Sequence, residues 1–216
     1  MLKDIQVTGN KDTRSGFGDG ILEAARTNEK IVALTADLLG SLKLNAFIKE
    51  FIEQSIYRIE ENTHRIIKCL QEIDEIEIWK FPNDNSNSIG NLILHLCGNI
   101  RQYVISALGE TKDIREREKE FAIKTGHTKS ELLNELTHTT SEAAGIIKNI
   151  DENRLTKIYS VQGFYLSGIG IIIHVTEHYS YHTGQIAFWI KQIKNKDLGF
   201  YANIDLNVKN EISNEQ

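Results

Sequence analysis

The sequence predicts an all-α protein built as a four-helix bundle, and three observations support this. Apolar residues recur with a helical period over long stretches from residue 52 onward. Pro82 is the only proline among 216 residues, so little interrupts a helix. Hydrophobic residues make up 40% of the chain and charged residues 25%, as in ordinary globular domains. Long helices joined by short or moderate connections pack most economically as a bundle.

Residues 1–51 follow a different pattern. Gly16, Gly18 and Gly20 open a helical pattern that ends near Asn28, and residues 31–35 form an apolar run of strand type. A helix followed by a buried strand is typical of an α/β sheet. The glycines do not predict a nucleotide-binding loop, because no strand precedes them and the third one comes too early.

The first two bundle helices flank a polar loop. Apolar side chains keep a helical period over residues 52–73, which predicts about six turns of helix. Residues 81–88 form the loop, and Ser88 is expected to cap the next helix. That second helix is expected over residues 89–108, with Gly109 closing it.

The second half of the chain predicts two further helices. The charged segment 110–127 is expected to be a surface connection, and residues 128–131 have the spacing of a capping box that begins the third helix. An irregular stretch follows, with an extended piece over 158–164. The fourth helix is expected over 168–194, and residues 207–216 are expected to form a disordered tail.

The fourth helix carries His174, His178 and His182 at steps of four residues. An α-helix advances about 100° per residue, so these rings share one stripe, and their apolar neighbours indicate that the stripe is buried. Histidines at i and i+4 can bind one divalent ion. About 12 Å of helical rise separates His174 from His182, so these two cannot easily share an ion.

A catalytic ion needs about three protein ligands, so a facing helix is expected to supply the third. His95 lies mid-helix on a buried stripe, whereas His64 lies on the shoulder of its stripe. His127 and His138 fall in a loop and on a polar face.

Two further residues near these histidines are candidate catalytic groups. Gln185 lies near His182, where it could orient a ligand ring or a bound water, or simply close a buried hydrogen bond. Glu177 sits about 100° off the stripe, so it could serve as a general base or be a solvated residue. Residues 174–178 also spell an inverted zinc-protease motif, but too few residues follow to supply that motif's later ligand.

Two segments carry a resemblance to a known family: Ser-Ile-Gly-Asn-Leu-Ile-Leu-His at 88–95 and Glu-His-Tyr-Ser-Tyr-His-Thr-Gly-Gln at 177–185. Through them, residues 52–206 resemble the DinB/YfiT-like superfamily of metal-binding four-helix bundles. The resemblance implies that His95, His178 and His182 are metal ligands. Thr183 stands where the family often has arginine, a departure that touches no ligand.

The same resemblance implies a function. It implies a divalent-metal-dependent enzyme, with zinc or nickel as the ion. Characterised relatives include thiol S-transferases that use a low-molecular-weight thiol, and they commonly pair as homodimers. A small-molecule substrate is therefore expected. The alternative is a non-catalytic, stress-associated bundle that binds metal or a small ligand.

Residues 1–51 resemble the start of a transketolase C-terminal half, through the segments 13–20, 31–37 and 40–51. The segment that would carry the family's catalytic glutamate is missing, so no thiamine diphosphate is expected. A single strand has no partner to pair with, so this fragment is not expected to form its own domain. A transketolase-related function is the least favoured reading.

Composition argues against several classes of partner. The net charge is −5 without a basic cluster, which argues against nucleic acid. The sequence shows neither a signal peptide nor an apolar run long enough to span a bilayer. Cys69 and Cys97 are the only cysteines, and buried thiols are expected rather than a disulfide. These features predict a cytoplasmic protein with no membrane partner.

Overall fold

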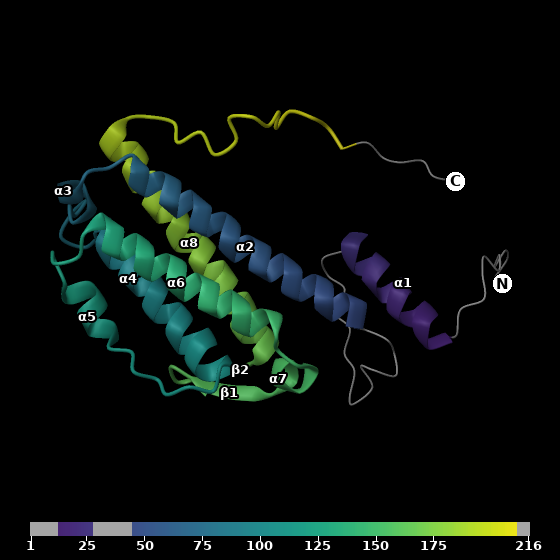
Figure 1. The fold of residues 1–216 in the computed structure, drawn as a ribbon. Helices are drawn as coiled ribbons and strands as arrows, with labels where there is room; N and C mark the ends of the chain where they lie inside the picture. Colours follow the sequence, from purple (N-terminus) through teal and green to yellow (C-terminus); the bar gives the residue numbers. More distant parts are fainter. Residues whose placement is uncertain (1–12, 28–44, 211–216) are drawn as a thin grey trace.

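Four long helices form a bundle in the computed structural model of this protein, which describes residues 13–27 and 45–210 (Figure 1). They are α2 (Asn45–Gln71), α4 (Ile89–Ile100), α6 (Lys129–Lys148) and α8 (Gly168–Lys194). Both α2 and α4 pack against α6 and α8, so the four helices enclose one core. The predicted all-α bundle is confirmed.

The other described elements lie around the bundle. They are α1 (Thr13–Thr27), α3 (Glu75–Ile78), the π-helix η1 (Arg101–Leu108), α5 (Arg117–Ala122), α7 (Glu152–Thr156), β1 (Ile158–Val161) and β2 (Phe164–Ser167). The two strands form an antiparallel hairpin in which Ile158 pairs with Ser167 and Val161 with Phe164. Gln162 and Gly163 both adopt positive φ at its turn, as a tight two-residue hairpin loop requires. The predicted extended piece is thus the first strand and turn of this hairpin.

The first bundle helix starts earlier than the sequence pattern suggested. Because α2 runs unbroken from Asn45, the boundary expected between residues 51 and 52 lies inside a helix. Ile48 and Phe51 pack against the core, so they extend the apolar stripe of the bundle.

The ends of the described chain lie outside the bundle core. The N-terminal helix expected after Gly16 is present as α1, where Arg26 lies 3.7 Å from Glu50 of α2. The strand expected over 31–35 falls outside the described residues. Residues 207–210 are exposed and form neither helix nor strand, and residues 211–216 of the expected tail lie outside the described part.

The second bundle helix begins as predicted and then changes type. Ser88 caps α4 by accepting a hydrogen bond from the Asn91 backbone N–H at 3.2 Å. The α-helix ends at Ile100, and the chain continues as a π-helix to Leu108. The expectation of one α-helix over 89–108 was therefore wrong in its second half. Such wider turns often occur at functional sites.

The last helix matches its predicted bounds. Ser167 caps the start by accepting from the Gly170 backbone N–H at 3.1 Å. Asn195 ends the helix in the left-handed conformation, at φ 47°. Among the described residues, no helix is long and apolar enough to cross a membrane.

Candidate metal centre

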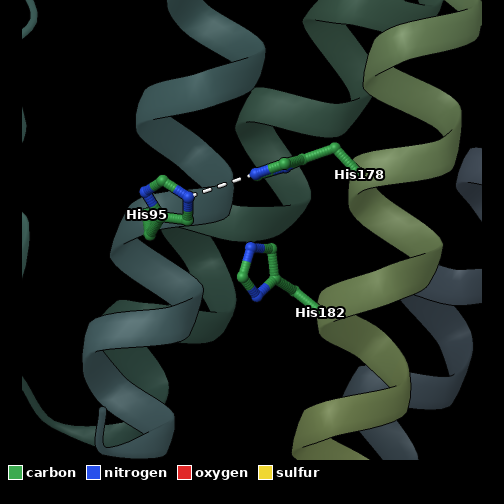
Figure 2. Close-up of side chains that lie close together, drawn as sticks. All are labelled: His95, His178 and His182. Atoms are coloured by element: carbon green, nitrogen blue, oxygen red, sulfur yellow. Dashed lines mark hydrogen bonds between the residues drawn. The ribbon is translucent and has the colours of Figure 1, made fainter. Parts of the chain in front are cut away.

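Helices α4 and α8 bring three histidines together inside the bundle. His95 projects from α4, and His178 and His182 project from adjacent turns of α8 toward it (Figure 2). The Nε2 atoms of His95 and His178 are 3.2 Å apart. All three residues offer ring nitrogens that lie within 4.8 Å of one another. The structure thus brings together the three residues predicted as metal ligands.

This donor set fits a divalent ion. Zinc–imidazole bonds are about 2.0–2.1 Å long, so tetrahedral ligand nitrogens lie roughly 3.4 Å apart. The separation of 3.2 Å between the Nε2 atoms of His95 and His178 is close to that spacing. The ligand atom of His182 lies within 4.8 Å of the other two.

The histidines on α8 are held neutral by their surroundings. Burial, together with the neighbouring rings of His182 and His95, lowers the pKa of His178 to about 3. Burial also lowers the pKa of His182, more than the hydrogen bond to Gln185 raises it. Neutral imidazole is the form that binds metal, so both rings are ready to act as ligands near pH 7.

Gln185 orients the ring of His182. Its Oε1 lies 2.7 Å from His182 Nδ1, so Nδ1–H donates to the amide oxygen and Nε2 keeps its lone pair. A partner of this kind fixes the tautomer of a metal-ligating histidine. Gln185 therefore lies where it can orient a metal ligand.

Replacing Gln185 with alanine is expected to weaken zinc binding about 10–100-fold, because outer partners of ligand histidines contribute this much to affinity. Competition against a chromophoric chelator measures the change. Gln192→Ala is the matched control, since Gln192 is exposed on the same helix. Equal affinities for the two variants would contradict a role for Gln185 in orienting the ring.

Glu177 does not join the histidine cluster. Its side chain is exposed and lines a groove of about 400 Å³ between α2 and α8, together with Arg58 and Arg65. It thus lies on a different face of α8 from the three rings. Of the two catalytic candidates, Gln185 alone contacts a candidate ligand.

His174 lies beside the cluster rather than in it. Its ring stacks on Tyr103 from the first turn of η1, with centroids 4.3 Å apart. Its Nε2 lies 3.4 Å from Asn99 Nδ2. His174 thus lies on the same stripe of α8 but packs beside the cluster. This agrees with the helical rise, which places it too far from His182 to share an ion easily. The remaining histidines lie outside the cluster: His64 on α2, His138 on α6, and His127 in the loop between α5 and α6.

The segment 110–127 is mostly exposed, as expected for a surface connection, but two of its side chains turn inward to the site. Glu120 on α5 is buried, and its Oε2 lies 3.0 Å from His95 Nδ1. Arg115 is bonded to the same carboxylate. Sequence reasoning missed both residues, because alternating charges from Arg115 to Glu120 give no sign of which side chain turns inward.

Two of the three histidines are partly exposed. His95 is buried, whereas His178 and His182 are only partly buried. Two aromatic rings flank the cluster: Phe121 lies 4.8 Å from the His95 ring and Tyr181 lies 5.0 Å from the His182 ring, centroid to centroid. The two histidines of α8 therefore form the more exposed side of the cluster.

Solved structures with the same fold come from several bacteria. A conserved protein from Enterococcus faecalis aligns with a TM-score of 0.57 at 16% identity, covering 67% of this chain and 97% of the other. A DinB-like protein from Bacillus subtilis gives 0.52 at 14% identity, covering 67% and 94%. A DinB-like protein from Bacillus cereus gives 0.53 at 14% identity, covering 66% and 90%. Identities this low show the fold alone.

No functionally curated protein matches the sequence. A family model, DUF1572, described as a protein of unknown function, matches residues 46–203. The match begins one residue after the start of α2 and takes in every bundle helix and all three clustered histidines. The chain therefore belongs to the DUF1572 family and has a DinB-like fold.

Proposed function

We propose that this protein is a divalent-metal-dependent enzyme, a thiol S-transferase that uses a low-molecular-weight thiol. The observation that carries the proposal is the convergence of three imidazoles, two of them partly exposed. A catalytic ion needs protein ligands on one side and an open position on the other, whereas a structural ion is closed in. His95, His178 and His182 would hold the ion, and zinc or nickel suits imidazole ligands.

The bound ion would supply a Lewis-acidic centre that lowers the pKa of a thiol bound to it. The three histidines would hold the ion, and the hydrogen bond to Gln185 would keep the His182 ring oriented. In the transfer, a bond forms between the thiol sulfur and the electrophilic carbon of the substrate. The bond from that carbon to its leaving group breaks, and the thiol proton passes to solvent.

The thiol has to come from outside the protein. Cys69 and Cys97 are both free and buried. Burial raises the pKa of each thiol to about 12. Neither cysteine can supply a thiolate at neutral pH, so the low-molecular-weight thiol is a second substrate.

The inertness of these cysteines is itself testable. A disulfide reagent such as Ellman's should react with neither thiol in the native protein and with both after denaturation. The native rate should be at least about 1000-fold below that of a free thiol, because a pKa near 12 leaves so little thiolate. Fast labelling of the native protein would show a reactive internal thiol and contradict the need for an external one.

The activity is tested with tag-free protein loaded with zinc or nickel. Cysteine, glutathione and bacillithiol are offered in turn with a chromogenic electrophile such as 1-chloro-2,4-dinitrobenzene, and thioether formation is followed by absorbance. Metal-dependent turnover that is lost in His182→Ala and kept in His138→Ala supports the proposal, since His138 is exposed on α6. Tight metal binding without turnover for any thiol would favour the non-catalytic binding protein instead.

A further inference from the structure

A buried ion pair lies directly behind the metal centre. Glu120 of α5 contacts Nδ1 of His95, the ring nitrogen that points away from α8. The side chains of Arg115 and Glu120 are only 3% and 10% exposed. We propose that Arg115 and Glu120 are positioning residues that hold His95 with its Nε2 lone pair toward the ion. This inference rests on the proposed metal site.

The hydrogen bonds around the carboxylate assign its role. Arg115 binds it with two donors, Nε to Oε1 at 2.7 Å and Nη2 to Oε2 at 2.9 Å. A carboxylate held by both arms of a guanidinium carries no proton and can only accept. The hydrogen between Glu120 and His95 therefore belongs to Nδ1. This leaves Nε2 with the lone pair that a metal ligand needs.

Arg115 also approaches His95, with Nη2 at 3.1 Å from Nδ1. A ring nitrogen carries either a hydrogen or a lone pair, so Nδ1 cannot serve both Arg115 and Glu120. Without a hydrogen on Nδ1, its lone pair would face those of Glu120 Oε2 at 3.0 Å, whereas Arg115 Nη2 has its acceptor in Glu120 Oε2 in either case. The pairing of His95 with Glu120 thus satisfies all three groups.

A glycine on α4 leaves space for the ion pair, and hydrogen bonds from α4 hold α5 in place. A Cβ at Gly98, one turn after His95, would overlap Glu120 Oε1 and lie 2.7 Å from Glu120 Cδ. Only glycine lets the carboxylate come this close to α4. On the other side, the buried Asn91 amide donates to the backbone oxygens of Glu120 and Ile123 at 2.8 and 2.7 Å. These contacts tie α5 to α4 from both directions.

Substituting Glu120→Gln separates orientation from simple packing. The glutamine has almost the same shape but only one acceptor oxygen, which Arg115 would take. Its NH₂ then faces Nδ1 of His95 and donates to it, so the ring hydrogen moves to Nε2. This exchange of tautomers is a consequence that a merely structural ion pair would not have.

The test combines two measurements on full-length protein. Zinc affinity is measured by chelator competition, and the His95 tautomer is read from ¹⁵N NMR of the imidazoles in metal-free protein. In Glu120→Gln we expect zinc affinity to fall about 10–100-fold and the ring hydrogen to move from Nδ1 to Nε2. Glu116→Gln is the control, because Glu116 is exposed on the same segment and pairs only with Lys119 among the contacts of its side chain that the structure records.

A second variant tests the same role without changing Glu120 itself, in case Glu120→Gln does not fold. Gly98→Ala should displace the carboxylate and weaken zinc binding in the same direction, while Gly145→Ala on α6 should not, because a Cβ there meets nothing within 4 Å. If wild type binds zinc and Glu120→Gln keeps both its affinity and its tautomer, the positioning role is overturned. If wild type binds no zinc, the metal site fails, and the tautomer in metal-free protein alone decides whether Glu120 orients His95.

Discussion

Replacing His178 with alanine is expected to reduce zinc affinity by at least about 100-fold, because even the loss of an outer partner costs about 10–100-fold. The ring of His178 has neighbours on both sides, with its Nε2 3.2 Å from that of His95 and its centroid 4.5 Å from that of His182. Its removal leaves two ligands, too few to hold the ion firmly. Chelator competition and metal analysis after dialysis both measure the loss.

The matched control for this variant is His138→Ala, which removes a histidine from an exposed position on α6. Its zinc affinity should equal that of wild type. Circular dichroism should show the same helix content in both variants. A His178→Ala protein that retains zinc as firmly as wild type would mean that the ion, if any, binds elsewhere.

The second large effect concerns the core that holds α4 and α8, the two helices that carry the clustered histidines. Ile66 of α2 is 0% exposed in the centre of the bundle. Ile66→Ala should lower the free energy of unfolding by about 2–5 kcal/mol, from lost burial and the cavity left behind. Urea denaturation followed by circular dichroism measures this change.

Ile76→Ala is the control for the core variant, because Ile76 on α3 is 86% exposed. Its effect should stay within about 0.5 kcal/mol, as for most surface substitutions. A small effect at Ile66 would show that the bundle core is less tightly packed than these helices indicate.

Periodicity predicted the long helices well because an amphipathic helix is specified by residues that are close together in the sequence. The apolar pattern predicted the fourth helix over 168–194, the bounds that α8 has, and in the structure Ser167 and Asn195 cap its two ends. Histidines four residues apart could be placed on one face for the same reason. The resemblance to a known family, rather than periodicity, joined His95 on the facing helix to His178 and His182, and the structure brings the three together.

The features that sequence reasoning missed depend on tertiary contacts. Nothing local distinguishes Glu120 from the exposed Glu116, since both lie in one run of alternating charges. Glu120 turns inward because Arg115 neutralises it and Gly98 leaves room for it. The π-helix after Ile100 likewise has no signal in the apolar pattern, which continues through Tyr103 and Val104.

The start of α2 was predicted too late, at residue 52, because here a local sequence signal was misleading. A local resemblance to another family ended at Phe51, yet the apolar stripe had already begun at Ile48. Packing on the bundle, rather than the resemblance, determines where the helix belongs. The family model likewise begins its match at residue 46, close to the start of α2 and not at residue 52.

X-ray absorption on tag-free wild-type protein loaded with zinc tests the metal site most directly. We expect one ion per chain, with three imidazole nitrogens at about 2.0–2.1 Å and a further light ligand from solvent. The fourth ligand should be replaced by sulfur when a low-molecular-weight thiol is added. A shell without imidazole, or protein that retains no zinc, would contradict the assignment of His95, His178 and His182 as the metal centre.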